Sequence, residues 1–186
     1  MKVSVGSVIE RLHAQGDVAK AGYLPKYKKP TPIPAKRLAT LRMPTGEPLP
    51  ADLAEWLRYD ASWLGLLKKK QKAFRAKPLR ELLEATLNEM RESDDEDVEE
   101  ELEELVEDLG DDDVLGFWLK SLPKPGLADV HAIVVPTAGD QEHFLMLEPG
   151  RKSLRVLGWH KRIEFWWKYD SFAAYLAHHF GFEPDE

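Results

Sequence analysis

The sequence predicts an α+β fold, in which an antiparallel β-meander of about four strands occupies the C-terminal half. Helices from the N-terminal half flank this sheet, and a C-terminal helix closes it. Two observations predict this class: apolar residues recur at helical spacing before residue 113, and short β-branched and aromatic runs separated by turn residues follow it. The expected strands are 130–135, 143–147, 153–159 and 163–169. Pro149 and Gly150 give a strong turn signal between two of them.

Helices are expected around this sheet wherever apolar residues form one stripe. They cover residues 5–15, 50–67, 79–87, 98–109 and 171–180. The fourth of these helices is acidic but keeps an apolar stripe, formed by Val98, Leu102, Leu105, Val106 and Leu109. Either Asp170 or Ser171 caps the last helix, and Gly181 ends it.

The chain divides into an N-terminal segment, 1–48, and a single α+β domain, 49–186, which includes an acidic helical insert at about 92–113. The N-terminal segment combines the first helix with an arm rich in proline and lysine. Seven prolines fall between residues 24 and 50, and proline removes backbone donors and favours extended chain. We expect this arm to lie over the surface or to be partly disordered, and a chain of 186 residues to form one core.

Charge is distributed very unevenly along the chain. The net charge is −7, but residues 1–80 carry +11 and residues 81–186 carry −18. Fifteen acidic residues lie between Glu92 and Asp113, with no basic residue among them. Two halves of opposite charge indicate either an internal pairing of the halves or a partner of complementary charge.

Composition excludes several classes of site. The chain has no cysteine, which removes disulfides, thiolate zinc sites and a cysteine nucleophile, and favours a reducing compartment. The N-terminus lacks the pattern of a signal peptide, and every apolar run is too short to span a membrane. We therefore expect a cytoplasmic protein without a membrane segment.

Two passages resemble one protein family. Residues 49–66, LPADLAEWLRYDASWLGL, and residues 169–176, YDSFAAYL, are similar to the opening helix and the closing helix of the SUKH superfamily. This superfamily includes the Smi/Knr cell-wall regulators and many bacterial immunity proteins. The resemblance implies an α+β fold with a sheet flanked by helices, no catalytic centre, and often an immunity role, in which the protein binds a toxin domain and blocks its active site.

The residues give little support to catalysis or to metal and cofactor binding. The sequence has no glycine-rich phosphate loop, no H-E-x-x-H and no G-x-S-x-G. His178 and His179 are neighbours on a predicted helix, so their side chains point about 100° apart and cannot share a metal. His131, His143 and His160 lie on different predicted strands, where they either converge or, more commonly, pair with polar neighbours. We expect no catalytic, metal or cofactor residue.

The candidate partner-binding surface is the acidic helix together with aromatic strand residues. Its residues are Glu99, Glu100, Glu103, Glu104, Glu107, Asp111, Asp112, Trp159 and Trp166. Strand alternation sends Trp166 and Trp167 to opposite faces, so one of them is expected to be exposed. The expected partner is a protein, such as a cationic, nuclease-like toxin domain.

Three alternatives remain open for the charged segments. The acidic run is a solvated helix face, or it folds against the basic half of the chain, or it binds a partner. A different class of function is a nucleic-acid-associated or regulatory scaffold protein that uses the basic segment 26–77, although the negative net charge and the absence of interleaved aromatic residues disfavour nucleic acid.

Overall fold

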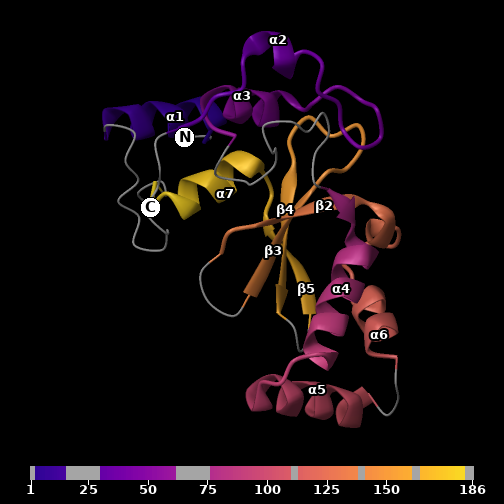
Figure 1. Cartoon of the computed structure of the whole chain (residues 1–186). Helices are drawn as coiled ribbons and strands as arrows, with labels where there is room; N and C mark the ends of the chain where they lie inside the picture. The colour runs from indigo at the N-terminus through magenta and orange to yellow at the C-terminus, as the bar shows by residue number, and fades with distance from the viewer. Residues whose placement is uncertain are drawn as a thin grey trace.

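The computed structural model describes residues 3–15, 30–61, 76–109, 113–137, 141–160 and 164–182. The helices are α1 (Val5–Ala14), α2 (Ala35–Leu38), α3 (Ala51–Tyr59), α4 (Leu79–Arg91), α5 (Glu96–Leu109), α6 (Val114–Lys120) and α7 (Phe172–His179), with a 3-10 turn η1 (Leu127–Asp129). The strands are β1 (Lys77–Pro78), β2 (His131–Val135), β3 (Gln141–Met146), β4 (Arg155–His160) and β5 (Glu164–Tyr169). Figure 1 shows the sheet with helices around it, which confirms the predicted α+β class.

The strands form one antiparallel meander in the order β1-β2-β3-β4-β5. The four strands from β2 to β5 are the predicted ones. The β3–β4 hairpin turns at Gly150, whose φ of 73° lies in the left-handed region that glycine adopts without strain. The edge strand β1 was not predicted, because a pairing of only two residues has no alternation to detect.

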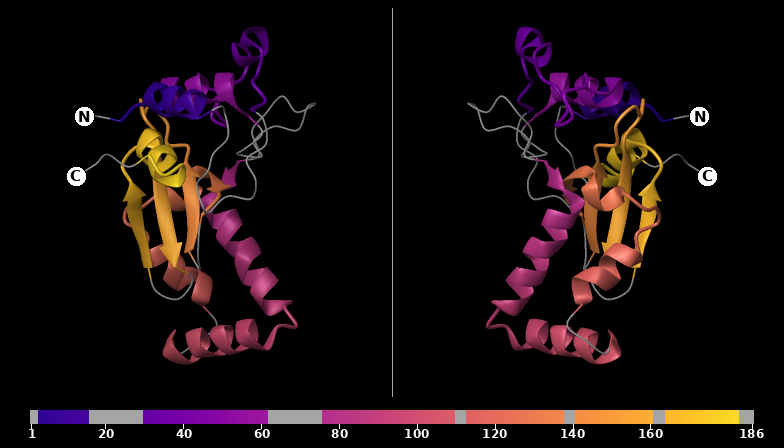
Figure 2. Two further views of the ribbon diagram at one scale, coloured as in Figure 1. Left: turned by 90° about the vertical axis from the view of Figure 1, so that its left-hand side faces the viewer. Right: turned by 90° about the vertical axis from the view of Figure 1, so that its right-hand side faces the viewer.

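Helices cover both faces of the sheet, so there are two hydrophobic cores instead of the single core expected from chain length (Figures 1 and 2). The first core lies between the sheet and α1, α3 and α7. The second lies between the sheet and α4, α5 and α6. Alternation along β3 assigns Leu145 to the first core and Phe144 to the second, and both side chains are buried.

Part of the N-terminal segment belongs to the first core. Helix α1 packs against α3 and α7. In the proline-rich arm, Ile33 donates its backbone N–H to the Leu57 carbonyl of α3 at 2.9 Å, and Leu38 and Met43 are buried. The described part of the arm is therefore anchored in the first core by a few buried side chains, while most of its other residues are exposed. Residues 16–29 lie outside the described residues.

A side-chain cap and a glycine fix the two ends of α7. The Ser171 hydroxyl accepts from the Ala174 N–H at 3.1 Å and begins α7, as one of the two predicted caps, and Gly181 follows its end with a φ of 68°.

Helix α3 ends at Tyr59, earlier than the predicted end at residue 67. The next residue, Asp60, is fully buried and extended, and its Oδ1 accepts from the Thr31 N–H at 3.0 Å.

Candidate interaction surface

Helix α5 forms the end of the molecule opposite α1, α2 and α3 (Figures 1 and 2). It packs against α4 and α6. Leu105 is 5% exposed, and Val98, Leu102 and Val106 are partly buried beside it, so these four residues of the predicted apolar stripe point into the second core. The side chain of Leu109, the fifth, lies outside the described residues. This packing turns most of the described glutamates of the helix outward.

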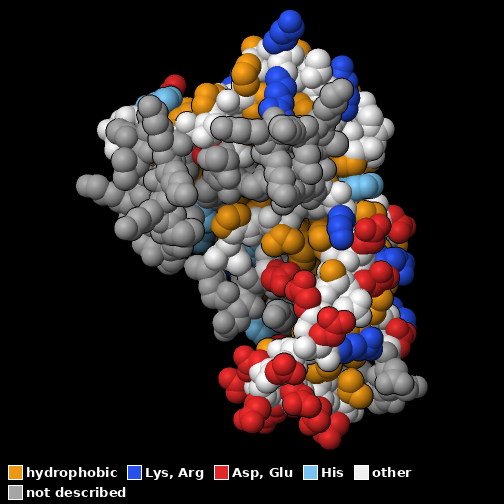
Figure 3. Space-filling model, in the orientation of Figure 1, with side chains coloured by type: hydrophobic (Ala, Val, Ile, Leu, Met, Phe, Trp, Pro, Cys, Tyr) orange, Lys and Arg blue, Asp and Glu red, His pale blue; other side chains and the backbone are white. Residues whose placement is uncertain are grey.

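The outward face of α5 is strongly acidic, and Figure 3 shows the acidic side chains gathered at this end of the molecule. The predicted residues Glu99, Glu100, Glu103, Glu104 and Glu107 are all exposed. Helix α5 contains no basic residue in its 14 positions. Asp111 and Asp112 lie outside the described residues.

The basic half of the chain does not cover this face with any of its described helices. Helices α1, α2 and α3 carry several of the N-terminal basic residues and lie at the other end of the molecule (Figures 1 and 2). Within the described residues, these helices are therefore too far from the acidic face of α5 to neutralise its charge. Residues 62–75, which hold most of the lysine run of the alternative segment 26–77, lie outside the described residues.

Trp159 is not part of the surface, which corrects its prediction as a partner-binding residue. It is fully buried in the second core. Its ring stacks on Phe165 with a centroid distance of 5.6 Å and meets Trp118 edge-on at 4.8 Å. The sequence did not predict α6, whose Trp118 packs on Trp159.

Trp166 lies on the face of the sheet that α7 covers and is half-buried. Its indole rests on Gly158 of β4, where a Cβ atom would approach it to 2.8 Å. Trp167 points to the opposite face and is also half-buried, and the Arg155 guanidinium carbon lies 3.3 Å from the centroid of its ring. Trp166 and the α5 glutamates therefore lie on different sides of the sheet and do not form one continuous patch.

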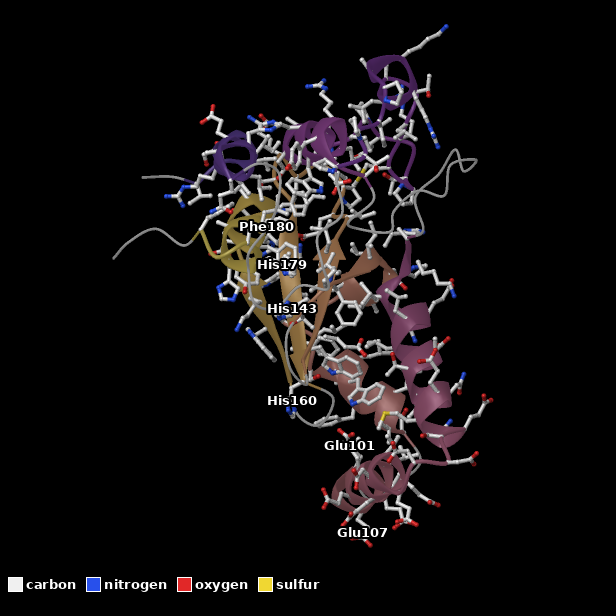
Figure 4. All side chains as sticks on the ribbon, turned by 60° about the vertical axis from the view of Figure 1, so that its left-hand side comes forward. Glu101, Glu107, His143, His160, His179 and Phe180 are labelled. Atoms are coloured by element: carbon white, nitrogen blue, oxygen red, sulfur yellow. The ribbon has the colours of Figure 1, made fainter. Side chains whose placement is uncertain are left out.

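The three strand histidines do not form a common site. His131 pairs with Pro78, His143 with Gly158, and His160 with Gln141 at the far end of β4. His160 is two positions along β4 from the residue opposite His143, and Figure 4 shows the two side chains at different levels of the sheet. Among the described residues, no group of three or more histidine, aspartate or glutamate side chains could hold a metal ion.

A buried histidine pair is the feature that the sequence analysis missed. His143 on β3 and His179 on α7 are 5% and 6% exposed and face each other across the interface between α7 and the sheet (Figure 4). Burial lowers the pKa of each imidazole to about 4. The signal was present in the alternation of His143 with Leu145 and Leu147, which placed His143 on an apolar face.

Neither of two cavities on the described surface gathers a catalytic set. One, of about 550 Å³, lies between α1, α3 and the proline segment. It is lined by Ile9, His13, Pro30, Pro32, Glu55, Arg58 and Tyr59. The other, of about 430 Å³, lies between residues 43–51 and the β3–β4 turn. Each has apolar walls with charged side chains of both signs.

Comparison with protein-family models, curated proteins and solved structures yielded no match to this chain. The resemblance to the SUKH superfamily therefore stays a prediction. Of the helices in the described segments, none combines the length and the apolar character needed to cross a membrane.

Proposed function

We propose that this chain is a non-catalytic, cytoplasmic protein-binding module that presents the outward face of α5 to a cationic partner. The observation that carries the proposal is the set of five exposed glutamates on a helix without a basic residue. A dense surface of one charge raises the association rate of an oppositely charged partner and orients its approach. Trp166, on another side of the sheet, is a separate candidate contact.

The energetics of α5 support this reading over that of an ordinary solvated face. Glutamates at i and i+4, such as Glu99 with Glu103 and Glu103 with Glu107, destabilise a helix by roughly 0.2–0.5 kcal/mol per pair. The last turn has no basic residue to offset the negative end of the helix dipole. The packing of Leu105 and its apolar neighbours holds the helix in spite of this repulsion, which a cationic partner would relieve.

The immunity role rests on the resemblance to the SUKH superfamily. In that family an immunity protein binds a toxin domain and blocks its active site. A nuclease-like toxin domain has a basic cleft for nucleic acid, and this charge is complementary to α5. We therefore take a toxin domain of this kind as the partner.

The experiment uses the full chain as bait in its native lysate, followed by mass spectrometry and rate measurements on the purified partner. Glu100→Gln, Glu103→Gln and Glu107→Gln are combined to remove three charges from the outward face. We expect the wild-type chain to retain a basic protein from the lysate. Cells that produce this basic protein should survive when they also produce the wild-type chain. The triple variant should associate roughly tenfold more slowly at low salt, because the steering field is weakened.

The control variant removes three exposed charges elsewhere: Glu10→Gln, Glu55→Gln and Asp129→Asn. It has the same net charge as the α5 variant, so it separates the local surface from the overall charge. We expect its association rate to match that of the wild-type chain. Equal rates for the two triple variants, or a lysate without a stable protein partner and no rescue from a neighbouring toxin gene product, would contradict the proposal.

A further inference from the structure

Strand β5 is the last strand in the order of the sheet, so it has a hydrogen-bonded neighbour on one side only. Among the described residues, no strand pairs with its other edge, and Figure 2 shows β5 as the outermost strand. Every second residue of an edge strand turns its backbone N–H and C=O away from the sheet, where another strand can bond to them. β5 therefore offers a template for strand pairing that is six residues long.

The opposite edge of the sheet is less suited to pairing. β1 consists of Lys77 and Pro78 alone, and a proline has no N–H to donate. Short strands and prolines are common means by which proteins protect sheet edges from other chains. β5 is longer and contains no proline, so it is the edge at which a further strand can be added.

An irregularity near the end of β5 leaves most of this edge regular. The register shifts between Val156 and Leu157 of β4, so Lys168 is the extra residue on β5. Bulges and lysines can block an edge, but this shift lies beyond Trp167, and the Lys168 ammonium lies over the ring of Trp166, 5.9 Å from its centroid. The first four positions of β5 keep a continuous register with β4.

The aromatic side chains of β5 are only partly covered. Trp166, Trp167 and Tyr169 are half-buried, on a sheet whose other aromatic residue in this strand, Phe165, is buried. Trp166 rests on Gly158 on one face, and Trp167 and Phe165 lie against the second core on the other. A strand added beside β5 covers the outer sides of these rings, and aromatic cross-strand pairs stabilise such a pairing.

The sequence of β5 is complementary to itself when a second copy runs antiparallel to it. In a pairing centred on Trp166, Phe165 stands opposite Trp167, and Glu164 stands opposite Lys168, each twice. Aromatic residues then meet aromatic residues, and the position of each negative residue meets that of a positive one. Both kinds of cross-strand pair are favourable.

Other centres are disfavoured by the pleat and by charge. Directly opposite residues of an antiparallel pair lie on the same face of the sheet, so a two-fold axis passes through a residue and not between two. A centre at Trp167 would put Glu164 opposite Asp170 and Trp166 opposite Lys168. Like charges directly opposite each other are destabilising, so Trp166 is the better centre.

We propose that the chain forms a two-fold symmetric dimer in which β5 pairs with β5 of a second copy, antiparallel and centred on Trp166. The two five-stranded sheets then join into one continuous sheet, and the two-fold symmetry uses the free edge of both copies at once. A pairing of two short strands buries a small area, which is typical of a transient association. This dimer is independent of the α5 surface, because it uses no residue of that helix.

Sedimentation equilibrium of the full chain at low salt measures the association. We expect the fraction of dimer to rise with concentration. Lys168→Glu places glutamates opposite each other twice in each dimer, so the dissociation constant should rise roughly tenfold. Lys77→Glu makes the same charge change at the exposed Lys77 of the opposite edge strand and should leave the dissociation constant unchanged. A wild-type chain that stays monomeric, or equal effects of the two variants, would overturn the proposal.

Mixing two variants tests the two-fold register. Glu164→Lys places lysines opposite each other, so this variant should also dimerise more weakly than the wild-type chain. A mixture of Glu164→Lys with Lys168→Glu restores opposite charges at both pairs of a heterodimer. We expect the mixture to associate as tightly as the wild-type chain. A mixture that associates no better than its two components would overturn this register.

Hydrogen exchange of the wild-type chain locates the interface without any substitution. Amides of β5 should exchange more slowly at concentrations at which the dimer forms than in dilute solution, because pairing protects them. The amide of Lys77 on β1 should exchange equally in both. Dimer formation that leaves the exchange of β5 unchanged would place the contact elsewhere and overturn the proposal.

Discussion

The pair formed by Glu148 and Arg155 gives the sharpest test of how the β3–β4 hairpin is held. The Glu148 carboxylate accepts from Arg155 Nε at 2.9 Å and from Nη2 at 2.8 Å, and the two side chains are 9% and 14% exposed. A buried charge left without its partner destabilises a protein by about 3–5 kcal/mol. Because some solvent reaches Arg155, we expect Glu148→Gln to lower the free energy of unfolding by about 2–3 kcal/mol.

A double-mutant cycle isolates the interaction itself. Glu148→Gln, Arg155→Met and their combination are unfolded in urea at pH 7, with tryptophan fluorescence as the signal. We expect a coupling energy of about 2 kcal/mol, because two charge-assisted hydrogen bonds are lost together. Arg155→Met also removes the stacking of Arg155 on Trp167. This loss occurs with or without Glu148, so it cancels in the coupling energy.

Arg151 provides the control for the same carboxylate. Its Nε lies 3.6 Å from Glu148 Oε2, and its side chain is 40% exposed. Solvent screens such a pair, so the coupling between Glu148 and Arg151 should not exceed about 0.5 kcal/mol. Equal coupling energies for Arg155 and Arg151 would refute the argument that burial and paired geometry set the strength of this contact.

Two other predictions concern the face that α7 covers. Gly158→Ala should lower the free energy of unfolding in urea by about 1–3 kcal/mol, since the added Cβ would lie 2.8 Å from the Trp166 indole; in a Trp166→Ala background this loss should shrink, and an equal loss there would contradict the steric explanation. The pKa of His143 and that of His179 are about 4 in the fold and 6.5 when unfolded, so stability is fully present above pH 6.5 and is lost toward pH 4. Each histidine contributes up to about 3 kcal/mol to this loss of stability. His143→Gln should therefore reduce the loss of stability between pH 6.5 and pH 4. A loss of the same size in that variant would count against burial of the imidazole as the cause.

Elements set by local signals could be predicted from the sequence. Alternating strand residues, the turn at Gly150, and the cap and stop of α7 at Ser171 and Gly181 all depend on neighbours within a few positions. The acidic helix was predicted for the same reason, because its apolar stripe recurs at helical spacing. Local pattern therefore determined the type and the approximate bounds of these elements.

Features that depend on contacts distant in sequence were missed. Trp159 seemed available to a partner because α6 and its Trp118 were not predicted, and the His143–His179 pair joins residues 36 positions apart. One signal was present but was not used. The unbroken apolar run from Phe144 to Leu147 is typical of a strand that is buried on both faces, and it would have indicated two cores.

The burial of the sheet on both faces has a consequence for how this molecule can change over time. Since neighbouring residues of a strand belong to different cores, a substitution that repacks one side leaves the side chains of the other side in place. The layer that carries the acidic helix can therefore change its surface residues while α1, α3 and α7 keep the fold stable. Substitutions in the two layers should combine additively, which allows either layer to be redesigned alone.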